Sequence, residues 1–494
     1  MTTPSISPGL LLAVVLGYFV VLIVISALTS GKGDSDAFFR GGKSSPWYLV
    51  AWGMIGASLS GVTFVSVPGV VGAGGLNQQL SYLQVVLGYL LGYAFIATVL
   101  LPLYYRLGLT SIYGYLEQRF GESSYKTGAA FFQLSRIIGA SFRLYLVAIV
   151  LDAWVLGPLG VPVWATVAIT LLLIYLYTFR GGIQTVVYTD TIQTLAMLLA
   201  VGVALVYLSN ELGDGLLDVP RLVSDSGLSQ TFFFGGGWED PNNFWKQFFS
   251  GALITVVMTG LDQDMMQKNL TCRTLADAQK NMGTLAVLLV PINLLFLCLG
   301  ILLYLYLGQS GIAVPDSADQ VFPLVALGKL PTLAGIAFII GLIAAAYSSA
   351  DSALTSLTTS FCVDFLGFQP EGEPRKRTRS LVHVGFAVVL FFVILAFYVI
   401  NDDSVINSLF RVAGLTYGPL LGLFAYGLMT KRSVADRWVP GVCIAAPVLT
   451  WLIDSNSANW LGGFKFGFLL LALNGLLTFV GLWAIGRRGA AGSV

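Results

Sequence analysis

The sequence predicts an all-α integral membrane protein with about thirteen transmembrane helices. Of its 494 residues, 56% are hydrophobic and 10% are charged, whereas roughly 25% of the residues of an ordinary soluble domain are charged. Long apolar segments recur along the whole chain, and each is long enough to cross a hydrocarbon core of about 30 Å. These segments are residues 8–29, 47–71, 78–105, 127–156, 160–179, 183–208, 242–267, 281–308, 331–363, 380–400, 404–430, 437–454 and 462–486.

The charges between these segments predict how the chain is oriented in a membrane. Cytoplasmic connections accumulate Lys and Arg, and here every second connection does so. The basic residues of that set are Lys32, Arg40, Lys43, Arg106, Arg119, Lys126, Arg180, Lys268, Arg273, Lys280, Arg375, Lys376, Arg377, Arg379, Lys431, Arg432, Arg437, Arg487 and Arg488. The opposite set is poor in them, and its longest member, about 209–241, is acidic. We expect an external N-terminus, a cytoplasmic C-terminus and a plasma membrane location, the inner membrane in a bacterium.

Composition and motifs exclude several classes of function. A formal net charge of +1 argues against a nucleic-acid partner. His383 is the single histidine and the four cysteines are scattered, so zinc sites, histidine catalysis and a disulfide framework have little support. The G-x-S-x-G, H-E-x-x-H and P-loop patterns of enzymes are missing. The chain is therefore predicted not to be an enzyme, with the lipid bilayer and a small solute as its partners and no protein partner indicated.

A hydroxyl-rich stretch, residues 344–360, follows an apolar run and gives the first indication of a functional site. Its polar side chains recur at three- and four-residue intervals and share one side of a helix. They are Ser348, Asp351, Ser352, Thr355 and Thr359. Hydroxyls can simply join helices in a membrane. A carboxylate near the bilayer centre costs about 2.5 kcal/mol or more, which favours a polar cavity or an ion, and oxygen ligands suit a hard cation such as sodium.

Two apolar segments carry polar or Gly/Pro interruptions at comparable places. The second holds Ser58–Thr63 and then Pro68-Gly69, and the seventh holds Thr259–Asp264. Such a pair is typical of transporters built from inverted repeats, although two ordinary kinks are the alternative. The pattern divides the chain into an N-terminal helix with the first cytoplasmic loop (1–46), repeat 1 (47–208), an extracellular loop (209–240), repeat 2 (241–430) and two C-terminal helices (431–494). Broken helices around a central site favour alternating access over a passive channel.

Four sequence elements resemble those of the sodium:solute symporter family, in the family's order. Asp36–Lys43 resembles its D-x-F-x-G-G-R/K element, and Thr110–Gly121 its T-S-x-Y-x-Y-L-E-x-R-F segment. Gly181–Ile183 with Val187–Gln193 is similar to its G-G-I/L and T-D-x-x-Q pattern, and Gln263–Lys268 to its element at the end of the seventh span. The resemblance implies a leucine-transporter-like fold of five plus five helices with one extra N-terminal and two extra C-terminal helices. It also implies sodium-driven uptake of a small organic solute.

The resemblance implies one sodium site, and in some members a second. The ligands carried over for the common site are Gly56, Leu59, Ala345, Ser348 and Ser349. Those for the second are Asp190, Ser348, Asp351 and Ser352, with Asp351 standing where members commonly have Ser or Thr. This additional carboxylate either strengthens a sodium site or shares a proton with Asp190. Asp190 can instead be a structural, hydrogen-bonded carboxylate.

The solute is expected where the two interrupted helices meet. The residues expected to line its site are Ser58, Ser60, Thr63, Gln84, Arg136 and Gln263. The segment around Arg136 resembles the sialic-acid branch of the family, in which an arginine binds a carboxylate, so sialic acid or a related sugar acid is the expected solute. A neutral sugar, a monocarboxylate and a vitamin are the alternatives. Arg136 and Arg143 share a helix face. Arg136 can alternatively pair with an internal aspartate: Asp152, Asp190, Asp262 or Asp264.

Overall fold

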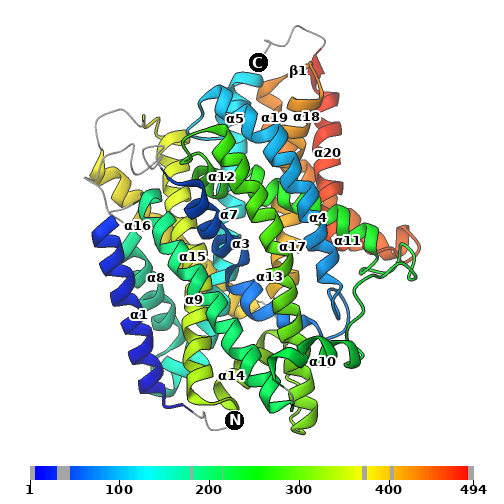
Figure 1. Cartoon of the computed structure of the whole chain (residues 1–494). Coiled ribbons are helices and arrows are strands. Elements are labelled where there is room, and N and C mark those ends of the chain that lie inside the picture. Colours follow the sequence, from blue (N-terminus) through cyan, green and yellow to red (C-terminus); the bar gives the residue numbers. More distant parts are fainter. Residues whose placement is uncertain are drawn as a thin grey trace.

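A computed structural model of the chain shows helices standing side by side in one bundle (Figure 1). It describes residues 6–29, 45–178, 182–213, 215–369, 375–400 and 405–487. The predicted family element at 36–43 and Gly181 lie outside these residues, as do Lys32, Arg180 and Arg488 of the charge pattern. A two-stranded sheet of β1 (Ser433–Val434) and β2 (Gly486–Arg487) marks one end of the bundle, at the top of Figure 1. Helix α10 (Val219–Asp225) lies at the other end.

Ten helical segments in the described part of the chain are long and apolar enough to span a membrane. They contain α1 (Pro8–Thr29), α3 (Trp47–Val70), α4 (Tyr82–Phe95) with η2 (Ile96–Leu100) and α5 (Leu101–Leu107), α7 (Glu122–Leu151) with η3 (Asp152–Leu156) and η4 (Gly157–Leu159), α9 (Gly182–Glu211), α13 (Leu275–Gln309), α15 (Thr332–Ser360) with η8 (Phe361–Phe365), α16 (Lys376–Ile400), η9 (Asp436–Trp438) with α19 (Val439–Trp460), and η10 (Gly467–Leu469) with α20 (Leu470–Ala484). An eleventh is the pair α17 (Val405–Thr416) and α18 (Gly418–Met429), bent by 46°.

Two predicted spans are too short or too broken to pass that test. One is α8 (Val163–Thr178), and the other is the chain α11 (Phe244–Thr255), η6 (Val256–Gly260) and α12 (Gln263–Asn269). The predicted number of thirteen is therefore not established by helix length alone. The remaining elements are α6 (Gly114–Arg119), η5 (Leu216–Asp218), η7 (Ala318–Gln320) and α14 (Val321–Gly328).

Helix α3 is broken where the sequence predicts an interruption. Ser60 has φ 32° and ψ 170°, outside the helical region, in the middle of an otherwise helical segment. A positive φ is uncommon for a residue with a side chain. The break removes backbone hydrogen bonds from this stretch, so carbonyl oxygens before it are available to other partners. Because 89% of the α3 span is buried inside the protein, these partners must come from the protein or from a bound ligand.

The second predicted interruption lies between η6 and α12. The helix stops at Gly260, and Asp262 starts α12 by accepting hydrogen bonds from the backbone N–H groups of Asp264 and Met265. This is an ordinary N-cap, because a carboxylate satisfies the free N–H groups of a first helical turn. The break thus turns the chain and presents two acidic side chains and one basic one on a short, buried helix.

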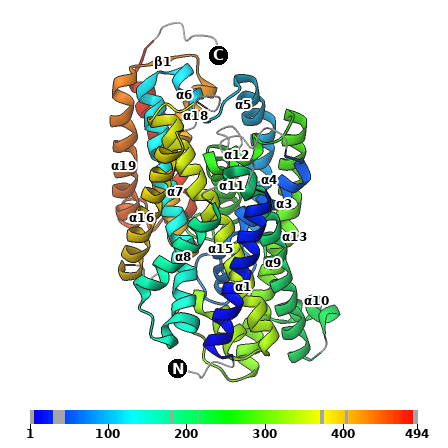
Figure 2. The same cartoon turned by 90° about the vertical axis from the view of Figure 1, so that its left-hand side faces the viewer.

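Helix α3 packs against α9, α13 and α15, while α1, which faces the viewer in Figure 2, packs against α9 and α15. At Gly56, α3 comes close to two of these helices. A Cβ atom on Gly56 would lie 2.2 Å from Thr194 Oγ1 in α9 and 3.3 Å from Ser348 Oγ in α15. Glycine at this position therefore allows the backbone of α3 to reach the hydroxyl groups of both neighbouring helices.

Candidate functional site

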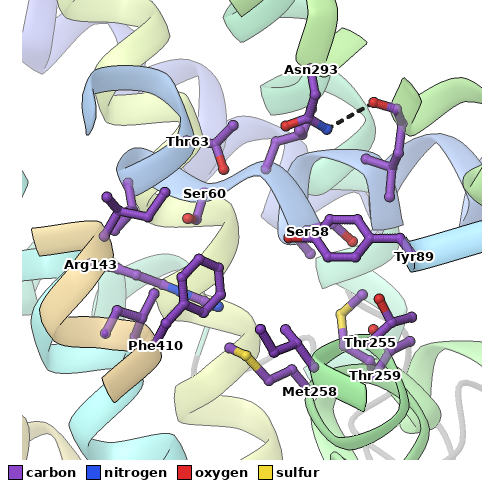
Figure 3. A pocket seen from close by; sticks show the side chains of 18 of the residues that line it. Ser58, Ser60, Thr63, Tyr89, Arg143, Thr255, Met258, Thr259, Asn293 and Phe410 are labelled. Atoms are coloured by element: carbon purple, nitrogen blue, oxygen red, sulfur yellow. Dashed lines mark hydrogen bonds between the residues drawn. The ribbon is translucent and has the colours of Figure 1, made fainter. Parts of the chain in front are cut away.

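A cavity lies beside the break in α3, enclosed by α3, α4, α7, α11, η6, α12, α13 and α17 (Figure 3). About half of the residues that line it have a polar side chain. The polar side chains are Ser58, Ser60, Thr63, Tyr82, Tyr89, Tyr93, Arg136, Arg143, Thr255, Thr259 and Asn293. Apolar residues such as Leu289, Leu409 and Phe410 form the rest. The two interrupted helices thus meet at a hydroxyl-rich cavity.

The serines and threonine of the α3 break face this cavity. Figure 3 shows Ser58, Ser60 and Thr63 on the broken segment, with Asn293 on the facing helix α13. Ser58 Oγ is buried and has no hydrogen-bond partner. Asn293 is held in place, because its Nδ2 donates to the carbonyl oxygen of Leu289 at 2.8 Å. These groups offer both donors and acceptors to a hydroxylated solute.

Arg143 also lines this cavity, and among the described residues it has no direct ion-pair partner. It is only 7% exposed and lines the cavity between Ser60 and Phe410 (Figure 3). Its Nε is buried without a hydrogen-bond partner, and it forms no ion pair with any residue in the described ranges. An arginine at membrane depth is costly unless it meets an anion. The cavity is therefore suited to a solute that carries a negative charge.

Arg136, on the same helix, is placed differently. Its Nη2 donates to Asp264 Oδ2, and its Nη1 lies 4.0 Å from Asp262 Oδ2. Both carboxylates are completely buried. The structure thus shows Arg136 in an internal ion pair, which was one of the two interpretations of the sequence, while its side chain also borders the cavity.

Short helix α12 is tied to several other parts of the bundle. Besides the pair with Arg136 in α7, Asp264 accepts a hydrogen bond from Ser352 Oγ in α15 at 2.5 Å. Tyr417, which precedes α18, donates to Asp262 Oδ2 at 2.5 Å. Lys268 Nζ donates to Asp190 Oδ2 in α9 at 2.7 Å, with both side chains at most 1% exposed. Helix α12 is thereby held toward the β1 end of the bundle.

The residues expected at the common sodium site come together between α3 and α15. Gly56, Leu59, Ala345, Ser348 and Ser349 are all buried, as the burial pattern of the two helices shows. Ser349 Oγ lies 3.5 Å from the carbonyl oxygens of Ala57 and Ala345. Ser348 Oγ has no hydrogen-bond partner. Two helices thus bring carbonyl and hydroxyl oxygens to one buried place, and oxygen ligands of this kind suit a hard cation.

At the expected second sodium site, two of the four residues already have other partners. One oxygen of Asp190 accepts from Lys268, and the hydroxyl of Ser352 donates to Asp264. Asp190 Oδ1 has no hydrogen-bond partner. Asp351 Oδ1 accepts from the backbone N–H of Ser352 at 2.5 Å. An ammonium group therefore lies at the carboxylate that was expected to bind sodium.

Gln84 and Gln263, which were expected at the solute site, are not among the residues that line this cavity. Gln84 Nε2 donates to the carbonyl oxygen of Asn242 and to Gln247 Oε1, each at 2.9 Å. The backbone N–H of Phe233 donates to Gln84 Oε1 at 3.0 Å. Gln263 also binds the backbone of a distant segment. The backbone N–H of Ile112 donates to Gln263 Oε1 at 2.9 Å, and Gln263 Nε2 donates to the carbonyl oxygen of Thr110 at 2.9 Å. Both glutamines fasten chain segments to one another.

The sequence profile of the sodium:solute symporter family matches residues 38–436. The chain belongs to this family. It is 27% identical over 458 residues to the sodium/sialic acid symporter SiaT of Proteus mirabilis, covering 88% of this chain and 87% of that protein. It is 26% identical over 466 residues to the human sodium/iodide cotransporter, covering 88% of this chain and 69% of that protein.

Solved structures confirm the fold class of this symporter. A sodium-coupled sialic acid symporter in a substrate-bound outward-open state superposes with a TM-score of 0.81 and 20% identity, over 97% of this chain and 99% of that one. A nucleobase-cation-symport-1 family transporter in a closed conformation gives a TM-score of 0.55 and 16% identity, over 90% of this chain and 93% of that one. The leucine-transporter-like architecture predicted from the sequence is therefore correct.

Sequence reasoning missed the tyrosine wall of the cavity in this symporter. Tyr82, Tyr89 and Tyr93 all come from α4, at spacings of seven and four residues, and the hydroxyls of Tyr82 and Tyr89 are 3.0 Å apart. This spacing places three aromatic side chains on one helix face, which periodicity could have revealed. Sequence reasoning also missed Lys268 as the partner of Asp190, because no local pattern relates the two.

Proposed function

We propose that this sodium-coupled symporter imports a small organic acid that carries several hydroxyl groups, and that Arg143 binds its carboxylate. The observation that carries the proposal is the buried guanidinium of Arg143, which lines the cavity and has no anionic partner among the described residues. An arginine fork matches a carboxylate with two parallel hydrogen bonds. The hydroxyl groups of Ser58, Ser60, Thr63, Thr255 and Thr259 suit the rest of such a solute.

The relatives favour an anion, and within anions a sugar acid. Two of them are named as sodium/sialic acid symporters, and others are named for iodide and for monocarboxylates. Sialic acid combines a carboxylate with hydroxyl groups, which is the combination that the cavity wall of this chain offers. A neutral sugar would leave the charge of Arg143 uncompensated when the cavity closes, which is unfavourable in a low-dielectric site.

Sodium and solute are proposed to act on the same broken segment of α3. The expected sodium ligands Gly56 and Leu59 lie within one helical turn of Ser58 and Ser60, which face the cavity. Binding of either ligand orders this segment, so the second ligand finds it already in place. Such coupling is reciprocal: sodium strengthens solute binding by the same factor as solute strengthens sodium binding.

We place the β1 end of the bundle in the cytoplasm of the cell, with the N-terminus outside. The basic connections predicted to be cytoplasmic support this placement, since Arg119 donates to the carbonyl oxygens of Thr430 and Arg432 beside β1. The ties of α12 then lie on the cytoplasmic side of the cavity. Release of the solute into the cell requires that these ties break, as alternating access demands.

Uptake into proteoliposomes tests the proposal. Sialic acid, lactate, glucose and galactose would be offered with an inward sodium gradient and, as a control, with an equal potassium gradient. We expect uptake of an acid that depends on sodium and that exchanges with unlabelled acid in counterflow. Uptake of a neutral sugar but of neither acid would contradict the proposed solute class, and equal uptake in potassium would contradict sodium coupling.

A further inference from the structure

An apolar groove lies on the outside of the bundle, between α8 and α16, and shares no residue with the cavity beside the α3 break. The two helices pack against each other, and only 22% of the α16 span is buried inside the protein (Figures 1 and 2). The groove has a volume of about 450 Å³. Seven of its eight lining residues are aliphatic or phenylalanine, and the eighth is Tyr175. Such a groove on the face of a membrane protein suits a hydrocarbon chain.

The groove exists because small side chains lie between larger ones. Ala168 on α8 and Ala387 on α16 leave space where the two helices face each other. Leu172 and Val388, which are 56% and 48% exposed, extend outward beside them. The two helices therefore form a channel open to the surrounding membrane, with a wall on each side.

One end of the groove is polar and is held together by hydrogen bonds. The hydroxyl groups of Tyr175 on α8 and Ser380 on α16 lie 3.4 Å apart. One turn further along, His383 joins three helices, with Nε2 3.2 Å from Thr178 Oγ1 in α8 and Nδ1 2.9 Å from Thr358 Oγ1 in α15. The groove thus changes along its length from an apolar end to an end with hydroxyl groups.

A single arginine stands in line with the groove beyond these hydroxyl groups. The start of α16 is rich in basic residues: Arg375, Lys376, Arg377 and Arg379. Arg377 is exposed, and it lies seven residues before Val384 and fourteen before Phe391, so it shares their helix face. It precedes Val384 by about 10 Å along the helix axis. The guanidinium of Arg375 lies elsewhere, 5.2 Å from the ring centroid of Phe368.

The basic start of α16 lies at the β1 end of the bundle. The hydroxyl group of Tyr125 in α7 donates to Asp364 Oδ1 in η8, shortly before α16, at 2.8 Å. In the adjacent position of α7, the backbone N–H of Ser124 donates to Asp436 Oδ1, two residues after β1, at 2.8 Å. In the orientation proposed above, this end faces the cytoplasm, where anionic lipids give the membrane surface a negative potential.

We propose that the groove between α8 and α16 binds an anionic phospholipid, with an acyl chain in the groove and the phosphate at Arg377. The hydroxyl groups of Tyr175 and Ser380 lie between these two places, and each can donate to an ester oxygen of the glycerol backbone. An arginine fork binds phosphate oxygens with charge-assisted hydrogen bonds. The choice of the cytoplasmic leaflet rests on the proposed orientation, whereas the binding itself depends on neither sodium nor solute.

Native mass spectrometry of the delipidated protein in detergent tests the headgroup contact. Dioleoyl phosphatidylglycerol would be compared with dioleoyl phosphatidylcholine, which has the same chains and no net charge. We expect the parent to bind phosphatidylglycerol more tightly. Arg377→Gln should lower the affinity for phosphatidylglycerol by roughly fivefold, as expected for one basic residue at an anionic headgroup, and leave that for phosphatidylcholine unchanged. Arg375→Gln is the matched control, because it removes the same charge two residues away without changing the groove.

A second pair of variants tests the acyl-chain contact. Ala387→Phe fills the groove and should weaken the binding of both lipids. Val389→Phe should change neither, because this 40% exposed residue is not among those that line the groove. If Ala387→Phe does not fold, Ala168→Phe fills the groove from α8 instead.

Three outcomes would overturn the inference. They are equal affinities of the parent for the two lipids, equal losses in Arg375→Gln and Arg377→Gln, and parental lipid binding in a folded variant whose groove is filled. The measurement uses no sodium gradient and no transported solute, so its failure is distinct from a failure of the uptake experiment.

Discussion

Two neighbouring regions, the cavity beside the α3 break and helix α12, differ in whether their buried polar groups have partners within the protein. In and beside the cavity, Ser58 Oγ, Arg143 Nε and Ser348 Oγ are buried without hydrogen-bond partners. Along α12, Asp264 and Lys268 each pair with an opposite charge on another helix. An unpartnered buried polar group costs about 1–3 kcal/mol. The first region is therefore suited to ligands that supply the missing partners, whereas in the second region opposite charges compensate one another and join α12 to the neighbouring helices.

The two arginines of α7 show this contrast within one helix. Arg136 and Arg143 have the same side chain, share a face and are both buried. Arg136 pairs with Asp264 of α12, whereas Arg143 lines the cavity and has no direct ion-pair partner among the described residues. A residue's role here follows from what the opposite helix presents to it. Changing one region should therefore alter stability and gating, while changing the other should alter binding.

The largest effect is expected at the buried pair of Lys268 and Asp190. Lys268→Met leaves the carboxylate of Asp190 without its cation, and breaking such a pair costs about 3–5 kcal/mol. The double variant Lys268→Met/Asp190→Asn removes both charges of this pair and should recover most of the stability. Thermal unfolding in detergent measures the stability of the single and the double variant. A double variant as unstable as the single one would show that charge pairing is not what the two residues contribute.

Arg143→Gln should have the next largest effect, and on binding instead of stability. Loss of a charge-assisted interaction in a desolvated cavity costs about 1.5–3 kcal/mol, which is roughly a 10- to 100-fold loss of affinity for an anionic solute. Arg143→Lys should also weaken binding, because an ammonium group lacks the planar fork. Arg221→Gln is the control, since that side chain is 64% exposed on α10. The KM for uptake of the anionic solute measures these effects. An unchanged KM in Arg143→Gln would refute the assignment of Arg143 as the carboxylate-binding residue.

Gln84→Ala should lower stability but leave solute affinity unchanged. The change leaves the backbone N–H of Phe233 and the amide of Gln247 without their partner, at a cost of about 1–3 kcal/mol. Gln84 does not line the cavity, so the KM should stay within about twofold of the parent. A KM that rises as much as in Arg143→Gln would place Gln84 in the solute site, as the sequence suggested.

The smallest effect concerns the second sodium site, which stays a prediction. Asp190→Asn in the Lys268→Met background, and separately Asp351→Ser, should lower the Hill coefficient for sodium toward one or change the pH dependence of uptake. The expected effect is the smallest because sodium must compete at Asp190 with the ammonium group of Lys268, which already lies there. Unchanged Hill coefficient and pH dependence in both variants would make the two aspartates structural.

The sequence predicted those features that depend on local pattern. The two breaks, the hydroxyl face of α15 and the family membership follow from residues close together in the chain, and Ser58, Ser60 and Thr63 were placed at the cavity because they lie within a break. Gln84 and Gln263 do not line the cavity, and no local pattern could show this because their hydrogen-bond partners lie 149 to 163 positions away. The choice between Arg136 and Arg143 depends in the same way on where α12 places Asp264, which no spacing within α7 reveals.

The sodium dependence of uptake tests the central claim most directly, that sodium binds where the α3 break meets α15. Ser348→Ala and Ser349→Ala would be compared with Ser356→Ala, a buried serine of the same helix whose hydroxyl already donates to the carbonyl oxygen of Ala353 at 3.0 Å. Loss of one oxygen ligand should raise the half-saturating sodium concentration by about 2- to 10-fold, while Ser356→Ala leaves it unchanged. The same half-saturating concentration in Ser348→Ala, Ser349→Ala and the parent would contradict the site.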